Sequence, residues 1–447
     1  MTNDKKIVVR FPPSPTGLFH MGNARTLLFN YLFAKKNNGR IVLRLEDTDK
    51  ERSREEYSQD IIDNLKWLGI EPDSLVAIRQ SERGPVYKKY LEKMISEGKA
   101  YFSKETVVEE GQRDQVIRFK NPNKKIVFND LIRGDIEFDT TELKDFIIAK
   151  SLEEPVYHLA VVVDDYEMGV SHIIRGDDGI SNTPRQILIQ EAIGAPRPVY
   201  AHLPLILTQD RTKLSKRKHG EKVSVTFYRN AGYLPEAVVN FLALIGWNPG
   251  DEREIFSKEE LIKEFSLDKI QKSGGVFNPE RLDWYNGQYI RKIETEKLAK
   301  MLLEYLPEEW KKSATENYSY WLKIVELEKN RITKLSDIKE GIGYFFNEPE
   351  YTKEMLLWKK EPNMEKTKKH LQEVVKLLST LSENEFNQDK IKETVWNYAE
   401  KEGKGNVLWP MRVALTGMEK SPDPFAVAGV LGKEKTIKRL TYAIEKI

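Results

Sequence analysis

The stretch Phe11-Pro-Pro-Ser-Pro-Thr-Gly-Leu-Phe-His-Met-Gly-Asn23 follows a short apolar segment, Ile7–Val9, and precedes a segment with helical periodicity. A glycine-bearing loop that runs from a strand into a helix presents backbone N–H groups and the positive end of the helix dipole to an anion. Gly17 and Gly22 allow close approach of the backbone, and His20 can donate a hydrogen bond to a phosphate. This stretch therefore predicts an α/β fold with a phosphate site near His20 and Gly22.

A second segment, Lys213-Leu-Ser-Lys-Arg217, places Lys213 and Lys216 three residues apart in a polar loop. Mobile ammonium groups can meet phosphate as charge develops on it. Taken singly, a histidine in a Pro/Gly-rich loop can be structural, and a lysine-rich run is usually a solvated loop. The two segments together predict phosphate-handling elements on opposite sides of an α/β pattern.

The composition limits the classes of protein to be considered. A chain of 447 residues suits about two to four domains. Hydrophobic residues make up 40% and the mean hydropathy is −0.56. Because no apolar run or signal-like start is found, a cytoplasmic location without a membrane partner is expected. The 72 Lys and Arg nearly balance the 70 Asp and Glu, so net charge neither indicates nor excludes nucleic acid. The absence of cysteine excludes disulfides and cysteine-ligated metals.

Strand and helix patterns alternate over about the first hundred residues and again from about 154 to 210, which predicts a parallel sheet of Rossmann type with ligands at the carboxyl ends of its strands. Short β-type segments between about 101 and 153 predict a small α+β insertion between the two sheet halves. The predicted strands are Ile7–Arg10, Arg40–Leu45, Gln115–Phe119, Ile126–Asn129, Asp135–Phe138, Phe146–Ala149, His172–Arg175 and His202–Leu207, and the predicted helices are Ala24–Lys36, Asp49–Leu68, Tyr87–Ser96 and Pro184–Ile193.

The remainder of the chain has helical patterns, including Val223–Asn230 and Leu234–Ile245, and it is helical to the end after about residue 292. Leu371, Val374 and Leu378 form one apolar stripe. The sequence Ser382-x-x-Glu385 predicts a capping box before the helix that contains Ile391. The fold class expected is therefore α/β followed by all-α.

Five longer motifs narrow the family. Together with the two segments above, they resemble the bacterial-type glutamyl-tRNA synthetases of the class I aminoacyl-tRNA synthetase family. The motifs are Arg10-Phe-Pro-Pro-Ser-Pro-Thr-Gly17, Arg44-Leu-Glu-Asp-Thr-Asp49, Tyr157-His-Leu-Ala-Val-Val-Val-Asp-Asp165, Arg175-Gly-Asp-Asp178 and Ser181-Asn-Thr-Pro-Arg-Gln186.

The resemblance implies five regions. These are the first half of a Rossmann-type catalytic domain (1–100), a shortened connective insertion that binds the tRNA acceptor end (101–153), the second catalytic half (154–210), the lysine-bearing loop with a stem-contact domain (211–292), and an all-helical, cage-like anticodon-binding region (293–447). Some relatives hold zinc in the insertion. With no cysteine, this chain is expected to hold none.

The resemblance also implies the reaction. ATP activates L-glutamate to glutamyl-adenylate, and the glutamyl group then passes to the 3′-terminal ribose of tRNA. Mg²⁺ would accompany ATP, held by phosphate and water, so no protein metal site is expected. The phosphate-handling and catalytic residues would be His20, Gly22, Lys213 and Lys216, with Asp178 near the ribose or the amino acid and the backbone of Ile206 near the adenine.

For glutamate, the resemblance places Arg10 and Arg175 on the carboxylates, because the planar guanidinium group binds carboxylate in a bidentate manner. Tyr157 would add a hydroxyl near the side-chain carboxylate, Ser14 a further hydrogen bond, and Glu46 would take the substrate ammonium group. The alternative is a purely structural Arg–Glu pair. Asp47 to Asp49 could likewise be helix-capping residues only.

For tRNA, Leu408-Trp-Pro-Met-Arg-Val-Ala-Leu-Thr-Gly417 resembles a C-terminal family motif. Arg412 could contact an anticodon base and Trp409 could stack on one, or the two could be a salt-bridged arginine and a buried tryptophan. In the family that this chain resembles, a large side chain commonly stands at the position of Gly179, so the resemblance predicts open space beside the substrate or the tRNA terminus.

Partner choice stays open in the sequence. The tRNA substrate could be tRNA(Glu), tRNA(Gln) or both, and a monomer is the state that the resemblance implies. A glutaminyl-tRNA synthetase and a truncated paralogue that modifies a tRNA base are disfavoured by the helical C-terminal region. A catalytically inactive tRNA-binding homologue is disfavoured because His20, Lys216 and Arg175 are all present.

Overall fold

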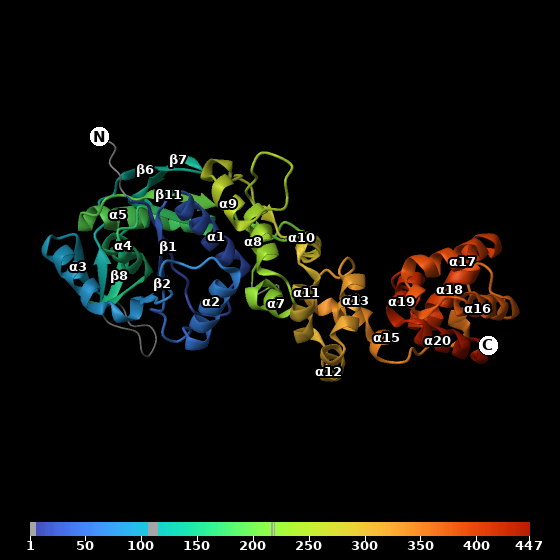
Figure 1. The fold of residues 1–447 in the computed structure, drawn as a ribbon. Helices are drawn as coiled ribbons and strands as arrows, with labels where there is room; N and C mark the ends of the chain where they lie inside the picture. The colour runs from blue at the N-terminus through green and yellow to red at the C-terminus, as the bar shows by residue number, and fades with distance from the viewer. Residues whose placement is uncertain (1–5, 106–114, 216–217, 219) are drawn as a thin grey trace. The chain divides into compact units, whose positions relative to one another are not determined.

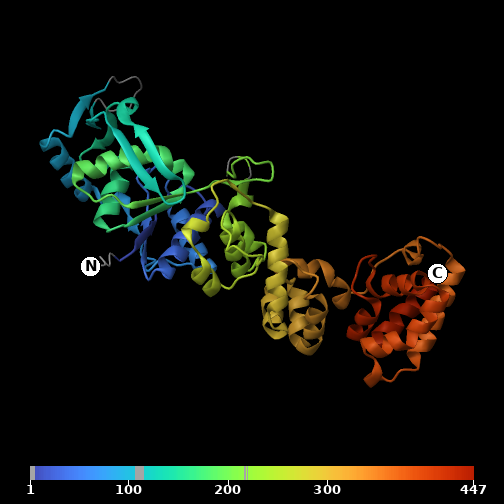
Figure 2. The same ribbon diagram turned by 90° about the horizontal axis from the view of Figure 1, so that it is seen from above.

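The computed structural model describes residues 6–105, 115–215, 218 and 220–447. The chain divides into two compact units, Met1–Tyr285 and Asn286–Ile447, which Figures 1 and 2 trace in colour from blue to red. None of the described helices is both long and apolar enough to cross a membrane. Lys216 and Arg217, which belong to the second predicted phosphate element, lie outside the described residues.

The first sheet is parallel and has the strand order β1-β2-β3, with β1 at Val8–Phe11, β2 at Arg40–Leu45 and β3 at Ile78–Arg79. Helix α1 (Met21–Lys36) connects β1 to β2, and α2 (Glu55–Leu68) connects β2 to β3. Strand β1 is wholly buried, as a parallel strand covered on both faces should be. These connections bring the loops after β1 and β2 to the same edge of the sheet.

A second sheet has the strand order β10-β11-β6-β7. Strands β10 (His172–Gly176) and β11 (Val199–Leu203) are parallel, whereas β6 (Lys125–Asp130) and β7 (Gly134–Asp139) form an antiparallel hairpin from the insertion. Strand β6 joins β11 through the pairing of Asp130 with Tyr200. The insertion therefore contributes two strands to the sheet that carries the second catalytic half.

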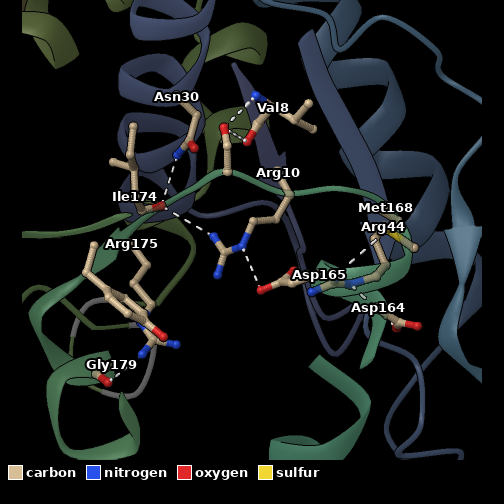
Figure 3. Close-up of polar contacts among 12 residues, drawn as sticks. Val8, Arg10, Asn30, Arg44, Asp164, Asp165, Met168, Ile174, Arg175 and Gly179 are labelled. Atoms are coloured by element: carbon tan, nitrogen blue, oxygen red, sulfur yellow. Dashed lines mark hydrogen bonds and ion pairs between the residues drawn. The ribbon is translucent and has the colours of Figure 1, made fainter. Parts of the chain in front are cut away.

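The two sheets meet at β1 and β10. The N–H of Val8 donates to Ser171 Oγ at 2.9 Å, and the N–H of Ser171 donates to the carbonyl of Val8 at 2.9 Å. Asn30, on α1, donates to the carbonyl of Ile174 at 3.1 Å (Figure 3). Neighbouring parallel strands that come from the two halves of the chain form a crevice at their carboxyl ends, where α/β proteins bind ligands.

The rest of the insertion is an antiparallel sheet with the order β4-β5-β8-β9. Its strands share a hydrophobic core with three helices of the catalytic halves, so the insertion is packed into the unit rather than tethered to it. The strands are β4 (Ala100–Lys104), β5 (Gln115–Phe119), β8 (Phe146–Ser151) and β9 (Glu154–Pro155), and the helices are α3 (Gly84–Ser96), α4 (Tyr157–Glu167) and α5 (Thr183–Ile193).

The end of the first unit is mainly helical, with β12 (Ile206–Leu207) and β13 (Gly275–Val276) forming a short parallel pair. The helices are α7 (Val225–Asn230), α8 (Pro235–Leu244) and α9 (Lys258–Glu264), and α10 (Pro279–Lys292) runs across the boundary between the units. Short 3₁₀ helices in this unit are Gln80–Glu82, Thr140–Leu143, Asp177–Asn182, Gly220–Val223 and Leu267–Lys269.

The described residues of the second unit are helical throughout, which confirms the expected α/β plus all-α class. Leu371, Val374 and Leu378 form the buried face of α16, as their spacing predicts. The helices are α11 (Thr295–Leu302), α12 (Glu308–Glu316), α13 (Tyr318–Glu328), α14 (Ile338–Gly341), α15 (Gly343–Phe346), α16 (Met364–Ser379), α17 (Gln388–Glu402), α18 (Lys404–Thr416), α19 (Pro424–Leu431) and α20 (Lys433–Lys446), with short 3₁₀ helices at Leu303–Tyr305, Leu335–Asp337, Lys353–Leu356 and Glu383–Glu385.

Several boundaries in the first unit differ from the sequence prediction, including the starts of α1 at Met21 and α3 at Gly84, and two of the differences have a clear cause. Helix α2 begins at Glu55 rather than Asp49, because the N–H of Arg54 donates to the carbonyl of Pro15 and ties this loop to the proline-rich segment. The predicted strand His202–Leu207 is two strands, because Pro204 has no N–H with which to continue the ladder.

One capping prediction in the second unit also differs. The capping box of Ser382 and Glu385 closes a 3₁₀ turn, Glu383–Glu385. The helix that contains Ile391 has its own N-cap, Asn387, whose side chain accepts from the N–H of Lys390. The motif is a capping box, as predicted, but it caps the 3₁₀ turn rather than the helix α17 that follows it.

Candidate active site

A cavity of about 670 Å³ lies at the carboxyl ends of β1, β2 and β10. It brings together residues that are far apart in the sequence, from the proline-rich loop, from the start of α4 and from the loop before the second phosphate element. The cavity is lined by every sequence-predicted catalytic, glutamate-binding and ATP-binding residue that the structure describes: Arg10, Ser14, His20, Gly22, Glu46, Tyr157, Arg175, Asp178, Ile206 and Lys213. Lys216 is the one predicted site residue of this unit outside the described residues.

His20 is the N-cap of α1, and its Nδ1 accepts a hydrogen bond of 2.8 Å from the N–H of Gly22. In a neutral imidazole whose Nδ1 accepts, Nε2 carries the proton and is the donor. A Cβ atom at position 22 would lie 3.0 Å from Nδ1, so glycine permits this close approach. The expected role of the Gly22 N–H therefore changes, because that N–H is donated to His20 and is not presented to an anion.

Lys213 and Asp178 form an ion pair across the mouth of the cavity, with Nζ 3.1 Å from Oδ2. Both side chains are more than half exposed. An exposed pair of this kind contributes on the order of 0–1 kcal/mol, so an incoming phosphate can displace the carboxylate at little cost. Lys213 is held at the base of its loop by backbone pairing with Leu207.

Beneath the cavity lies a buried network of opposite charges (Figure 3). Arg44 is fully buried, and its Nη1 donates to Asp165 at 2.7 Å while its Nη2 lies 3.4 Å from Glu46. Arg10 approaches the same Asp165 from β1 at 3.5 Å. Asp164 lies 3.8 Å from Arg44.

This burial shifts the pKa values of the network. Burial alone would lower the pKa of the Arg44 guanidinium, but Asp165, Glu46 and Asp164 raise it above its ordinary value. Burial raises the pKa of the Glu46 carboxyl, although Arg44 and Arg10 oppose that shift. Because Glu46 is also a cavity residue, it connects the buried network to the site.

Arg175 is also buried, but its hydrogen-bond acceptors are all neutral. Its Nε donates to His202 Nε2 at 3.1 Å, and its Nη2 donates at 2.9 Å to both the carbonyl of Gly179 and Thr183 Oγ1. Its Nη1 is buried and has no hydrogen-bond partner among the described residues. Burial lowers the pKa of this guanidinium.

Gly179 lines the cavity, but the space directly at its missing Cβ atom is occupied. A Cβ atom at position 179 would lie 2.4 Å from Nε of Arg175 and 2.7 Å from its Cδ. The space that the missing side chain leaves is therefore filled by Arg175. The sequence showed that a side chain was missing, but only the folded chain shows which neighbour uses the room.

Sequence reasoning missed several cavity residues, including Thr16, Asn182 and Arg25. Arg25 lies one turn into α1 and is 2% exposed, and it donates to the carbonyls of Pro204 and Ile245. Burial lowers the pKa of its guanidinium to about 10. An arginine in the first turns of a helix normally reads as a solvated residue, so only the packing of the neighbouring loops reveals this position.

Two family models match the sequence: tRNA synthetases class I (E and Q), catalytic domain, over residues 6–110 and 103–284, and the Anticodon binding domain over residues 297–444. Glutamate–tRNA ligase 1 of Syntrophomonas wolfei is 40% identical and covers 99% of this chain and 97% of its own. The chain belongs to the glutamate–tRNA ligase family. Glutamate–tRNA ligase 1 of Caldanaerobacter subterraneus is also 40% identical, over 99% of this chain and 98% of that protein.

A solved structure extends the comparison to three dimensions. The crystal structure of a glutamate tRNA ligase from Elizabethkingia meningosepticum in complex with its amino acid aligns with a TM-score of 0.86 and 34% identity, covering 99% of both chains. As a member of the glutamate–tRNA ligase family, the chain is a class I aminoacyl-tRNA synthetase. Enzymes of this class use ATP and have an amino acid and a tRNA as substrates.

The motif Leu408–Gly417, on α18 and directly after it, lies within the matched anticodon-binding domain. The indole Nε1–H of Trp409 donates to the carbonyl of Met355 at 2.9 Å, and its ring lies 5.2 Å from that of Trp358. Among the described residues, the side chain of Arg412 donates through Nη1 to the carbonyls of Ser421 and Pro422 and to Ser421 Oγ. Both residues are half-buried, so each has an intramolecular partner and a remaining accessible face.

The structure also bears on metals. Within the described ranges, no group of three or more His, Asp or Glu residues is arranged to hold a metal ion. The cavity is instead lined by the cationic side chains of Arg10, Arg175 and Lys213, together with His20. These cationic groups suit carboxylates and phosphates, and the carboxylates of Glu46 and Asp178 line the same cavity.

Proposed function

We propose that this chain charges tRNA with L-glutamate in two ATP-dependent steps through the residues of this cavity. The observation that carries the proposal is that two buried arginines and the Glu46 carboxylate line the same cavity as His20 and Lys213. Glutamate carries two carboxylates and an ammonium group, and ATP carries phosphates. One cavity therefore holds complementary groups for both substrates, side by side.

For glutamate, we propose that Arg10 and Arg175 bind the carboxylates and that Glu46 binds the ammonium group. Tyr157 and Ser14 line the same cavity and would supply hydroxyl groups. Burial supports the assignment to the arginines, because a charge-assisted hydrogen bond is stronger where water is excluded. With Nη1 unpartnered among the described residues, Arg175 has a donor to give to a carboxylate.

For ATP, the assignment rests on the positions of His20 and Lys213. His20 would donate from Nε2 to the phosphates, since its Nδ1 is engaged by Gly22. Lys213, and Lys216 on the same loop, would meet the leaving pyrophosphate once the Asp178 pair opens. In-line transfer at phosphorus depends on such positioning and positive charge rather than on covalent help from the protein. Asp178 would contact the ribose and the backbone of Ile206 the adenine, and Mg²⁺ would be held by phosphate oxygens and water.

For tRNA, we propose that the glutamyl group is transferred to the 3′-terminal ribose of tRNA(Glu), while tRNA(Gln) is an additional or alternative acceptor to be tested. Trp409 and Arg412 would meet the anticodon with the faces that remain accessible beside their internal hydrogen bonds. The proposed working state is a monomer, because one chain supplies both the cavity and the anticodon-binding domain.

The test is attachment of radiolabelled glutamate to purified tRNA(Glu) and tRNA(Gln) with ATP and Mg²⁺, side by side. Charging of tRNA(Glu) alone indicates a discriminating enzyme, charging of both indicates a mischarging enzyme, and charging of tRNA(Gln) alone indicates a specialised one. Folded protein that charges neither tRNA would overturn the proposal. Sedimentation of the active fraction tests the monomer.

A further inference from the structure

The side chain of Arg175 is held in a single conformation by its surroundings. Its three hydrogen bonds fix both Nε and Nη2, which leaves Nη1 as the nitrogen without a partner among the described residues. Within those residues no carboxylate lies within ion-pair distance of it. A buried cation of this kind is held ready for an anionic ligand, because only a ligand can compensate its charge.

The acceptor for Arg175 Nε is itself set by a second residue. His202, on β11, is fully buried, and its Nδ1 lies 2.6 Å from Oδ2 of Asp130. Asp130 also accepts from the backbone N–H groups of Ile132, Arg133 and His202, at 3.0, 2.9 and 3.0 Å. A carboxylate surrounded by N–H donors must accept from Nδ1 as well, so the ring proton lies on Nδ1 and Nε2 presents a lone pair.

The pKa values agree with a neutral imidazole beside an ionised carboxylate. Burial lowers the pKa of the His202 imidazole, with the Asp130 hydrogen bond opposing it. Burial alone would raise the pKa of the Asp130 carboxyl, but the hydrogen bonds from His202, Arg133 and Ile132 hold it below its ordinary value. The geometry and the charge states therefore give the same tautomer.

Gly179 completes the arrangement. Its backbone is outside the left-handed region, so alanine would suit the backbone, but a Cβ atom would lie 2.4 Å from Nε of Arg175. This contact involves the middle of the arginine side chain and not its tip. In the conformation that Arg175 adopts in this chain, a side chain at position 179 would fit only if Arg175 or the backbone of residue 179 moved.

We propose that Asp130 and His202 are positioning residues that fix Arg175 for carboxylate binding, and that Gly179 provides the room that this conformation of the Arg175 side chain requires. The inference rests on the proposed role of Arg175. Asp130 is the last residue of β6, in the insertion, whereas Arg175 belongs to the second catalytic half. The insertion therefore acts on the amino-acid pocket indirectly, through the contact of one buried carboxylate with His202, in addition to its expected contact with tRNA.

Asp130→Asn is the first variant. The amide oxygen of the substituted side chain would still accept from the N–H groups of Ile132 and Arg133, so its NH₂ group would face His202 Nδ1. An NH₂ donor facing Nδ1 favours the Nε2–H tautomer of His202. The Nε2–H group of His202 and the Nε–H group of Arg175 would then both be donors, and their hydrogen bond would be lost. We expect the KM for glutamate to rise about tenfold or more, with the KM for ATP and for tRNA unchanged.

The tautomer itself is a readout that a purely structural role would not move. The chain has 6 histidines, so ¹⁵N-histidine labelling of the full-length protein gives a short list of signals to assign. We expect a neutral Nδ1–H imidazole for His202 in the natural protein and an Nε2–H imidazole in Asp130→Asn. An Nε2–H or doubly protonated ring in the natural protein would overturn the proposal.

Further variants keep the test independent of folding. In His202→Gln the side-chain oxygen can still accept from Arg175, so glutamate binding should be partly retained, whereas His202→Phe should lose it. Gly179→Ala should raise the KM for glutamate without touching the Asp130–His202 pair. The matched control is Tyr200→Phe, which removes a buried hydroxyl on the same strand that is hydrogen-bonded to Gln190.

The outcomes separate this inference from the proposed function. If Arg175→Met leaves the KM for glutamate unchanged, the proposed role of Arg175 fails. If Arg175→Met raises it but Asp130→Asn, His202→Phe and Gly179→Ala change it no more than Tyr200→Phe does, the positioning proposal fails and the role of Arg175 stands. Equal rises in the KM values for glutamate, ATP and tRNA would also overturn the positioning proposal, because they indicate general loss of structure.

Discussion

Two buried arginines near the ends of β2 and β10, the strands on either side of β1, have opposite surroundings. Arg44 on β2 has Asp165, Glu46 and Asp164 within 4 Å, and its pKa is raised. Arg175 on β10 has only neutral acceptors, and burial lowers its pKa. Arg44 and Arg175 are therefore both buried arginines, and they differ in the charge of their hydrogen-bond partners. The arginine whose charge is already compensated ties β2 to α4, and the one whose charge is not compensated is suited to a ligand.

The largest expected effect comes from breaking the compensated region. Arg44→Met removes the cation that Asp164 and Asp165 share, leaving Asp164 with Arg83 at 2.7 Å and Asp165 with Arg10 at 3.5 Å. Loss of one partner from a buried ion pair costs about 3–5 kcal/mol, and these remaining cations should reduce that cost toward the lower end. Hydrogen exchange of the backbone amides of β1 and β2 measures the loss locally. Arg175→Met is the matched control, since it removes no carboxylate partner and should change that exchange little. Equal protection in both variants would contradict the comparison.

The next effect is on binding rather than on stability. Arg175→Met should raise the KM for glutamate about 30- to 100-fold, because a buried charge-assisted hydrogen bond to a carboxylate contributes about 2–3 kcal/mol. The KM for ATP should stay within about twofold. Steady-state pyrophosphate exchange in the presence of tRNA measures both constants. A rise confined to ATP would place Arg175 in the wrong half of the cavity.

Glu46 belongs to both regions, and its raised pKa makes the comparison pH-dependent. A carboxyl group with a raised pKa takes up its proton at a higher pH than an ordinary glutamate does. As pH falls through that raised pKa, Glu46 loses the negative charge that would attract the substrate ammonium, so the KM for glutamate should rise. The KM for glutamate should be measured from about pH 5 to 8. In Glu46→Gln it should be about tenfold higher than in the natural protein at neutral pH, and it should not rise further as the pH falls. A pH profile identical to that of the natural protein would remove Glu46 from the site.

The smallest effect concerns a third arginine, Arg412, whose partners are carbonyl and hydroxyl oxygens. Burial lowers its pKa, as for Arg175. Arg412→Ala should raise the KM for tRNA about three- to tenfold and leave the KM values for ATP and glutamate unchanged. Trp409→Phe is a useful companion, because it removes the hydrogen bond to Met355 but keeps an aromatic face. An unchanged KM for tRNA in Arg412→Ala would make that arginine purely structural.

Much of the fold could be predicted because its signals are local. The apolar strands around Val9 and Leu43, the helical period of Leu371 and Val374, and the loop that ends at His20 all depend on residues within one or two turns of each other. The family, the fold class and the ligase activity were likewise predicted from motifs and are confirmed. The roles of the site residues stay predictions, although the described ones all line one cavity.

The differences between prediction and structure have two kinds of cause: partners distant in the sequence, and local features such as Pro204 and the Asn387 cap. The start of α2 depends on a hydrogen bond from Arg54 to Pro15, whereas the break after β11 follows from the missing N–H of Pro204. The space at Gly179 was read as open because a sequence shows which atoms are missing and not which atoms move in.

By itself, the sequence determined the chemistry of this protein, since it supplies arginines, lysines, a histidine and a glutamate in motifs whose local backbone carries them to strand ends and helix starts. Only the tertiary structure decided which of the arginines has its charge compensated. Asp130 and His202 are 72 residues apart, and Arg44 and Asp165 are 121 residues apart. Charge compensation falls off over a few ångströms, so it is set by contacts in the folded chain that the order of residues does not reveal.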